Sequence, residues 1–148
     1  MSLDWRTIRW DDWSYSGVVS DRIAEILGWE LSQIDRGKWW DPYDKQETGL
    51  YVFNARDAAH FFDPLNDVHE ALFAAARLAD RRHLPFRLER LSDGQWRASF
   101  SLGGRNDEIS GIQQIPCKAI CEAILKVNDV PNPNSLFRKK TDHAAPPR

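Results

Sequence analysis

Two segments in which apolar and polar residues alternate flank the tripeptide at positions 92–94, a pattern typical of a β-hairpin. A two-residue turn would place Phe86 and Leu88 opposite serines. A three-residue loop whose glycine is left-handed instead places Phe86 opposite Phe100 and Leu88 opposite Ala98. Because this register buries one continuous apolar face, we predict the three-residue loop.

The other face of the predicted hairpin is polar. It carries Arg87, Glu89, Arg97, Ser99 and Ser101. Since alternate residues of a strand point to opposite faces, we predict that this face is open to water or to a partner.

Three further segments have apolar residues at helical spacing, and they predict helices over residues 19 to 28, 66 to 82 and 115 to 128. Residues 103 to 111 between the hairpin and the last helix are predicted to form a polar loop, and residues 50 to 53 a short strand. The fold class is therefore α+β, a small antiparallel sheet covered by three helices.

Side chains at the ends of these segments predict the helix boundaries. Ser20 and Asn66 are the expected N-caps of the first and second helices, Gly28 is expected to end the first, and Pro116 to begin the third. The predicted buried stripe of the second helix is Val68, Leu72, Ala75 and Ala79, widened by Ala71 and Leu78. That of the third is Cys117, Ile120, Cys121, Ile124 and Val127.

Length and composition indicate one folded domain. The chain has 148 residues, of which 42% are apolar and 28% are charged, a balance typical of globular proteins. We expect an aromatic N-terminal segment, 1–18, docked on a domain of residues 19–128, and a disordered basic tail, 129–148. No apolar run approaches a membrane span and no signal peptide is recognised, so the expected location is the cytoplasm, without membrane association.

Charge is distributed unevenly along the chain. Four basic and two acidic residues lie from position 129 onward, which leaves the tail at +2 and residues 1 to 128 at −4. An acidic body is unsuited to direct binding of nucleic acid, whose phosphates attract lysine and arginine. A protein partner is therefore the expected ligand, and no motif for a cofactor is present.

The two cysteines, Cys117 and Cys121, are one helical turn apart. Zinc sites usually draw four ligands from two spaced pairs, and the sequence offers no second pair. We interpret both as reduced cysteines of the core.

Tryptophans supply the strongest candidates for a binding surface. Trp39, Trp40, Asp41 and Tyr43 form one group, and Trp10, Asp11, Asp12 and Trp13 form another. Tryptophan dominates binding hot spots, but the same rings can cap a small core, and both interpretations stay open for each group.

A catalytic interpretation would begin with histidines beside carboxylates. The candidates are His60 with Asp57 and Asp63, and His69 with Asp67 and Glu70. The sequence has neither a nucleophile elbow nor the paired spacing of metal-ligating histidines, so solvated surface positions are the expected interpretation.

Five local strings between residues 19 and 128 resemble the phage alpha-beta-alpha sandwich domain, a family of small phage-encoded proteins. They are Gly28-Trp29, Trp39-Trp40-Asp41-Pro42, Pro64-Leu65-Asn66-Asp67, Trp96-Arg97-Ala98-Ser99-Phe100 and Lys118-Ala119-Ile120-Cys121-Glu122-Ala123-Ile124-Leu125. The resemblance implies a layered sandwich and brings no catalytic residues with it. The N-terminus and residues 44 to 59 depart from the family's pattern.

The resemblance and the acidic body lead to one hypothesis and two alternatives. The first is a phage or prophage accessory protein that binds a host protein or ribonucleoprotein complex without catalysis, as an inhibitor of an antiviral system such as CRISPR. The second is a small-ligand or nucleotide-binding protein with a pocket between the sheet and residues 37 to 62. The third is an enzyme that uses His60 or His69. The oligomeric state stays open.

Overall fold

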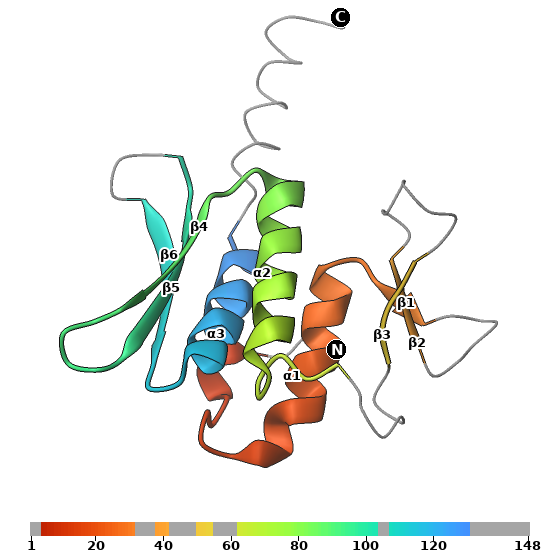
Figure 1. The fold of residues 1–148 in the computed structure, drawn as a ribbon, viewed down its shortest axis with the longest axis horizontal. Coiled ribbons are helices and arrows are strands. Elements are labelled where there is room, and N and C mark those ends of the chain that lie inside the picture. The colour runs from red at the N-terminus through yellow and green to blue at the C-terminus, as the bar shows by residue number, and fades with distance from the viewer. Residues whose placement is uncertain (1–3, 32–37, 42–49, 55–61, 104–106, 131–148) are drawn as a thin grey trace, which may run out of the picture.

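The computed structural model describes residues 4–31, 38–41, 50–54, 62–103 and 107–130. Within these ranges the chain forms three helices, six strands and two short 3-10 turns (Figure 1). In chain order they are η1 (Trp5–Thr7), η2 (Trp13–Tyr15), α1 (Ser16–Ile26), β1 (Glu30–Leu31), β2 (Lys38–Asp41), β3 (Leu50–Asn54), α2 (Val68–Arg82), β4 (Phe86–Arg90), β5 (Trp96–Ser101), β6 (Glu108–Gln113) and α3 (Pro116–Asn128).

The strands form two antiparallel sheets, in the orders β1-β2-β3 and β4-β5-β6. Helix α3 packs directly on β5 and β6, α2 packs on α3 and reaches β4, and α1 packs on α3. Figure 1 shows the three helices gathered on one face of β4-β5-β6. The predicted α+β class, with helices on a small antiparallel sheet, is confirmed.

The hairpin has the predicted register. Phe86 pairs with Phe100 and Leu88 with Ala98, and the glycine of the loop, Gly94, has a φ of +91°. The two phenylalanine rings are in contact at 5.0 Å between centroids. Of the two registers, only this one places all four side chains on the face that packs against the core.

The predicted loop at 103–111 is wrong over its second half, because β6 begins at Glu108 and pairs with β5 along its whole length. Gly111 resembles a turn signal in the sequence. In the fold it lies under α3, where an added Cβ would stand 2.4 Å from the carbonyl oxygen of Ala119. The glycine therefore allows the close approach of a helix to a strand.

Helix α1 begins at Ser16, earlier than predicted, and Ser20 is not its N-cap. Ser20 is buried inside the helix, where its hydroxyl donates to the carbonyl of Ser16 at 2.8 Å. The prediction at the other end is confirmed: Gly28, with a φ of +79°, follows the helix, and the amide of Trp29 donates to the carbonyl of Ala24 at 2.9 Å. This is the bond of a Schellman cap.

Helix α2 is capped by Asp67 and not by Asn66, since the Asp67 carboxylate accepts from two amides of the first turn. Its predicted stripe is also partly wrong. Val68 and Leu72 are exposed, and the buried residues are Ala71, Ala74, Ala75 and Leu78. Small side chains let α2 approach α3 closely, so the alanine face was buried in preference to the larger residues.

Helix α3 has the predicted stripe. Pro116 is in its first turn, and Cys117, Ile120, Cys121, Ile124 and Val127 are all buried. The two cysteines are free thiols, and burial raises the pKa of both, that of Cys121 well above its usual value. No helix among the described residues is long and apolar enough to cross a bilayer.

The N-terminal segment packs against the far end of α3. The indole N–H of Trp5 donates to the carboxylate of Asp129 at 2.8 Å, and the Lys126 ammonium lies 4.8 Å from the centre of the same ring. Ile8 is buried in the core. These contacts place residues 10 and 11 beside the sheet.

Candidate binding pocket

A pocket of about 340 Å³ lies where the N-terminal segment meets the end of sheet β4-β5-β6 and the first turn of α3. Three of its residues, Asp11, Gln114 and Ile115, are exposed, so the pocket is reached from solvent. It is lined by Trp10, Asp11, Gln95, Gln113, Gln114, Ile115 and Lys118.

Four parts of the chain position this lining. Gln95 immediately precedes β5, Gln113 ends β6, and Lys118 belongs to the first turn of α3. Trp10 packs against the core from the segment between the two 3-10 turns. The pocket therefore exists only in the assembled fold.

A hydrogen bond to α3 fixes the orientation of the Gln113 side chain. The side-chain amide of Gln113 donates to the Glu122 carboxylate at 3.0 Å, and the same oxygen accepts from the backbone amide of Ile112 at 2.9 Å. Glu122 is almost fully buried and also pairs with Lys126 at 3.5 Å. This network holds the end of β6, and with it the Gln113 side of the pocket, against α3.

The lining combines an indole, three side-chain amides and one charge of each sign. Each amide can both donate and accept hydrogen bonds, and an indole offers a rigid apolar surface. A volume near 300 Å³ lies at the small end of ligand pockets. The pocket thus has the size and chemistry for a side chain or a short segment with its backbone amides.

The residues predicted as a binding group in the N-terminal segment have different roles in the structure. Trp10 and Asp11 line the pocket. Asp12 instead supports the backbone, since its carboxylate accepts from the amide of Ser14 at 3.0 Å and from its hydroxyl at 2.7 Å. These bonds lower the pKa of Asp12. Trp13 belongs to η2, and its side chain lies outside what the structure describes.

The second predicted group is placed only in part. Trp39, Trp40 and Asp41 lie in β2, where Trp39 pairs with Phe53 of β3 and the register shifts between the two tryptophans. Their side chains, and Tyr43 as a whole, lie outside the described residues. The two groups of tryptophans are therefore not brought together by any described contact.

Two of the described catalytic candidates, Asp67 and Glu70, accept hydrogen bonds from backbone amides near the start of α2. His69 is exposed at the start of α2, and its backbone amide donates to the Asp67 carboxylate at 2.9 Å. Glu70 accepts from the backbone amide of Asp63, and partial burial raises the pKa of Glu70. His60 and Asp57 lie outside the described residues. Among the described residues no three His, Cys, Asp or Glu side chains gather to hold a metal ion.

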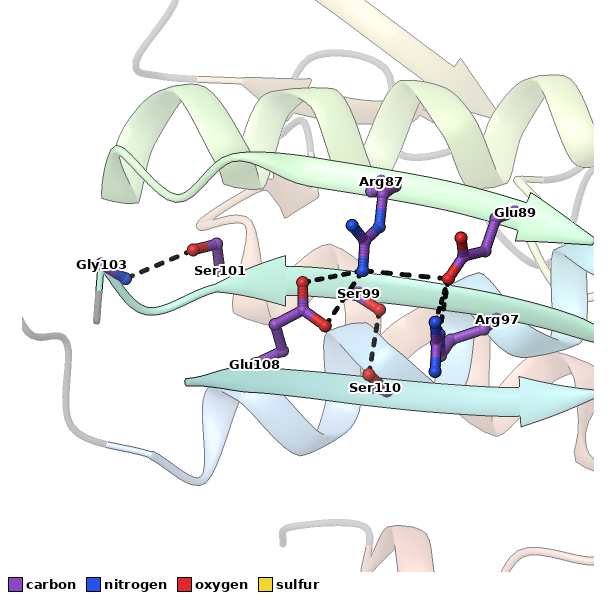
Figure 2. Close-up of polar contacts among 8 residues, drawn as sticks. All are labelled: Arg87, Glu89, Arg97, Ser99, Ser101, Gly103, Glu108 and Ser110. Carbon is purple, nitrogen blue, oxygen red and sulfur yellow. Dashed lines mark hydrogen bonds and ion pairs between the residues drawn. The ribbon is translucent and has the colours of Figure 1, made fainter. Parts of the chain in front are cut away.

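The outer face of the sheet, predicted to be open, carries charges that are already paired (Figure 2). Arg87 lies 2.9 Å from Glu108 and 3.8 Å from Glu89, and Arg97 donates to Glu89 at 2.7 Å through its Nε. The hydrogen bond from Arg97 lowers the pKa of Glu89. With its charges in balance, this face has little field with which to attract a charged ligand.

The aromatic side of the pocket was predictable from the sequence, and the amide side was not. Gln113 and Gln114 were assigned to no element because β6 was predicted to be a loop. The available signal was the polar pair Gln113-Gln114, separated from Pro116 by Ile115, at the junction of a strand and a helix. Gln95, 18 residues earlier, joins them only through the β5–β6 pairing.

Comparison with known proteins gives no relative from which a function could be transferred. No family model, no curated protein and no solved structure matches the chain.

Proposed function

We propose that the protein acts by binding another protein without catalysis, and that the pocket at the N-terminal segment receives a side chain or short segment of that partner. The observation that carries the proposal is the joint lining of one pocket by Trp10, Asp11 and three glutamines. Tryptophan is the side chain most enriched at binding hot spots, and amides match the hydrogen-bonding groups of a peptide.

The resemblance of five strings to a phage family supplies the biological setting of this proposal. In that setting the partner is a host protein or a ribonucleoprotein, and an inhibitor of an antiviral system is the role that it favours. The acidic body, at −4 over residues 1 to 128, supports a basic protein surface as the target.

The test uses Gln114, which is exposed, and Lys118, which is partly exposed, because Trp10 also supports the core. The wild type, a Gln114→Ala/Lys118→Glu variant and a Trp39→Ala/Trp40→Ala variant are used as baits in a lysate of the host, after circular dichroism has confirmed each fold. The pocket is supported as the binding site if a partner is retained by the wild type and by Trp39→Ala/Trp40→Ala, the β2 variant, but is lost by Gln114→Ala/Lys118→Glu, the pocket variant. Retention by the pocket variant, or no partner for the wild type, contradicts the proposal.

A second candidate function is favoured by the same lining. An indole beside amides and a lysine can also hold a planar anionic molecule such as a nucleotide. A ligand that binds only the native state raises the melting temperature, so a thermal-shift screen with nucleotides separates this candidate from the first. A rise that disappears in Gln114→Ala/Lys118→Glu would favour the small ligand.

A further inference from the structure

The two edges of sheet β4-β5-β6 differ in whether side chains cover their backbone groups. At the β6 edge, side chains of α3 occupy the outward-facing backbone groups. Glu122 accepts from the amide of Ile112 and Lys126 donates to the carbonyl of Ser110, both at 2.9 Å. These bonds block the addition of another strand beside β6.

The β4 edge has no such cover in the part of the chain that the structure describes, where β4 has a strand on one side only. The bond from the amide of Ser101 to the carbonyl of Pro85 fixes the alternation of the ladder. It leaves the N–H and C=O groups of Phe86, Leu88 and Arg90 pointing away from β5. This spacing is the one that a further antiparallel strand requires.

The residues of β4 are complementary to themselves. If a second copy lies antiparallel with Leu88 opposite Leu88 of the second copy, Arg87 faces Glu89 of that copy and Glu89 faces its Arg87. The same register pairs the outward-facing groups of Phe86 with those of Arg90 across the two-fold axis. We propose that β4 pairs in this way with β4 of a second copy, which joins two three-stranded sheets into one of six strands.

Helix α2 has an exposed apolar flank on the side away from α1. Val68 and Leu72 are 37% and 39% exposed, one turn apart on the helix. They lie opposite the flank that carries Phe73 and Arg81, both of which contact residues 27–29 after α1. In Figure 1, α1 and sheet β4-β5-β6 lie on opposite sides of α2, and α2 also reaches β4. The second copy supplies the cover that this patch lacks.

Charge selects the second copy over other strands. Charged residues on an edge strand normally repel an incoming strand. Here the signs alternate between Arg87 and Glu89, which lie side by side in Figure 2, so a strand that is antiparallel and centred on Leu88 meets an opposite charge at both positions. A one-residue slip moves the charges to the other face and loses both pairs.

The experiment measures the molar mass of the full chain by sedimentation equilibrium over a series of concentrations. The wild type is expected to approach twice the mass of one chain as the concentration rises. Arg87→Glu and Glu89→Arg each place like charges opposite one another and are expected to stay monomeric. An equal mixture of these two variants restores both opposite pairs, so the dimer is expected to return.

Controls separate the contact between copies from the ion pairs within one copy. Glu108→Gln removes the carboxylate that lies nearer to Arg87 of the two it pairs with inside the chain, and is expected to leave the dimer unchanged. Leu72→Lys changes an exposed side chain, so it keeps the fold while weakening the dimer. A wild type that is monomeric at every concentration overturns the proposal, as does a mixture that stays monomeric or single variants that dimerise as the wild type does.

Discussion

The inner and outer faces of sheet β4-β5-β6 are built from the same strands by different physical means. On the inner face, Ala98 and Phe100 have no exposed surface, and Gly111 leaves room for the backbone of α3. On the outer face, Arg87 and Glu108 keep part of their surface in water and hold each other by charge. The inner face is held by close packing. The outer face is held by ion pairs, whose charges water can solvate when a pair is broken.

This difference predicts where the protein tolerates change. A packed interior responds to every added or removed methylene, because its neighbours cannot relax fully. A solvated ion pair loses little when it is broken, since each charge regains water. Substitutions on the inner face should therefore cost far more stability than those one residue away on the outer face.

The largest effect is expected for Phe100→Ala, which removes a fully buried ring in contact with Phe86. Deletion of a buried phenylalanine costs about 3–5 kcal/mol, through lost transfer free energy and the cavity that remains. Urea unfolding measures this change in the free energy of unfolding. The matched control is Ser101→Ala on the outer face of the same strand, expected within about 0.5 kcal/mol of the wild type. Equal costs for the two variants would contradict the comparison.

The next effect is expected for Gly111→Ala. The added Cβ would lie 2.4 Å from the Ala119 carbonyl and 2.8 Å from the Ala123 nitrogen, and both are backbone atoms that cannot move aside independently. Overpacking of this kind typically costs about 1–3 kcal/mol, and the backbone contacts place this variant near the upper end. The control is Ile112→Val, an exposed position in the same strand. A thermal unfolding midpoint for Gly111→Ala as high as that of the control would show that α3 can move away from β6.

A smaller effect is expected for Glu122→Ala, which acts at the β6 edge of the sheet, between its two faces. The change leaves the amide of Ile112 without its acceptor at the sheet edge, which costs about 1–2 kcal/mol. Glu122→Gln keeps one oxygen as an acceptor and should recover part of this loss. Amide hydrogen exchange gives a local measurement, because the exchange of Ile112 should quicken more in the Ala variant than in the Gln variant. Identical exchange in the two would contradict the assigned role of Glu122.

The fold was predictable from the sequence where one pattern had one physical solution. The hairpin register followed from matching Phe86 with Phe100, and the α3 stripe followed from large apolar residues at helical spacing. The α2 stripe was partly wrong because hydropathy ranks Val68 and Leu72 above alanine. Which face is buried there depends on how closely α3 approaches, and no pattern within one helix contains that information.

The pocket was less predictable because its lining is assembled from four segments. Trp10 and Asp11 could be predicted as candidates for a binding surface, because an aromatic and an acidic residue in a terminal segment are a local signal. Gln95 and Gln113 became neighbours of Trp10 only through strand pairing and through the docking of Trp5 on Asp129. A glutamine carries no local signal of binding, so its role appears only once long-range contacts are known.

The smallest effect is expected on the outer face, for Glu89→Gln at a protein concentration low enough to keep the chain monomeric. The hydrogen bond from Arg97 lowers the pKa of Glu89 in the folded state. A carboxylate with a lowered pKa stabilises the fold above its unfolded pKa of about 4.3, and this contribution is lost as the pH falls through the folded value. The difference in unfolding free energy between wild type and Glu89→Gln should therefore be constant near neutral pH and shrink in acid. Urea unfolding between neutral pH and pH values below the folded pKa measures it, and a difference that grows in acid would show that Arg97 does not stabilise the ionised carboxylate.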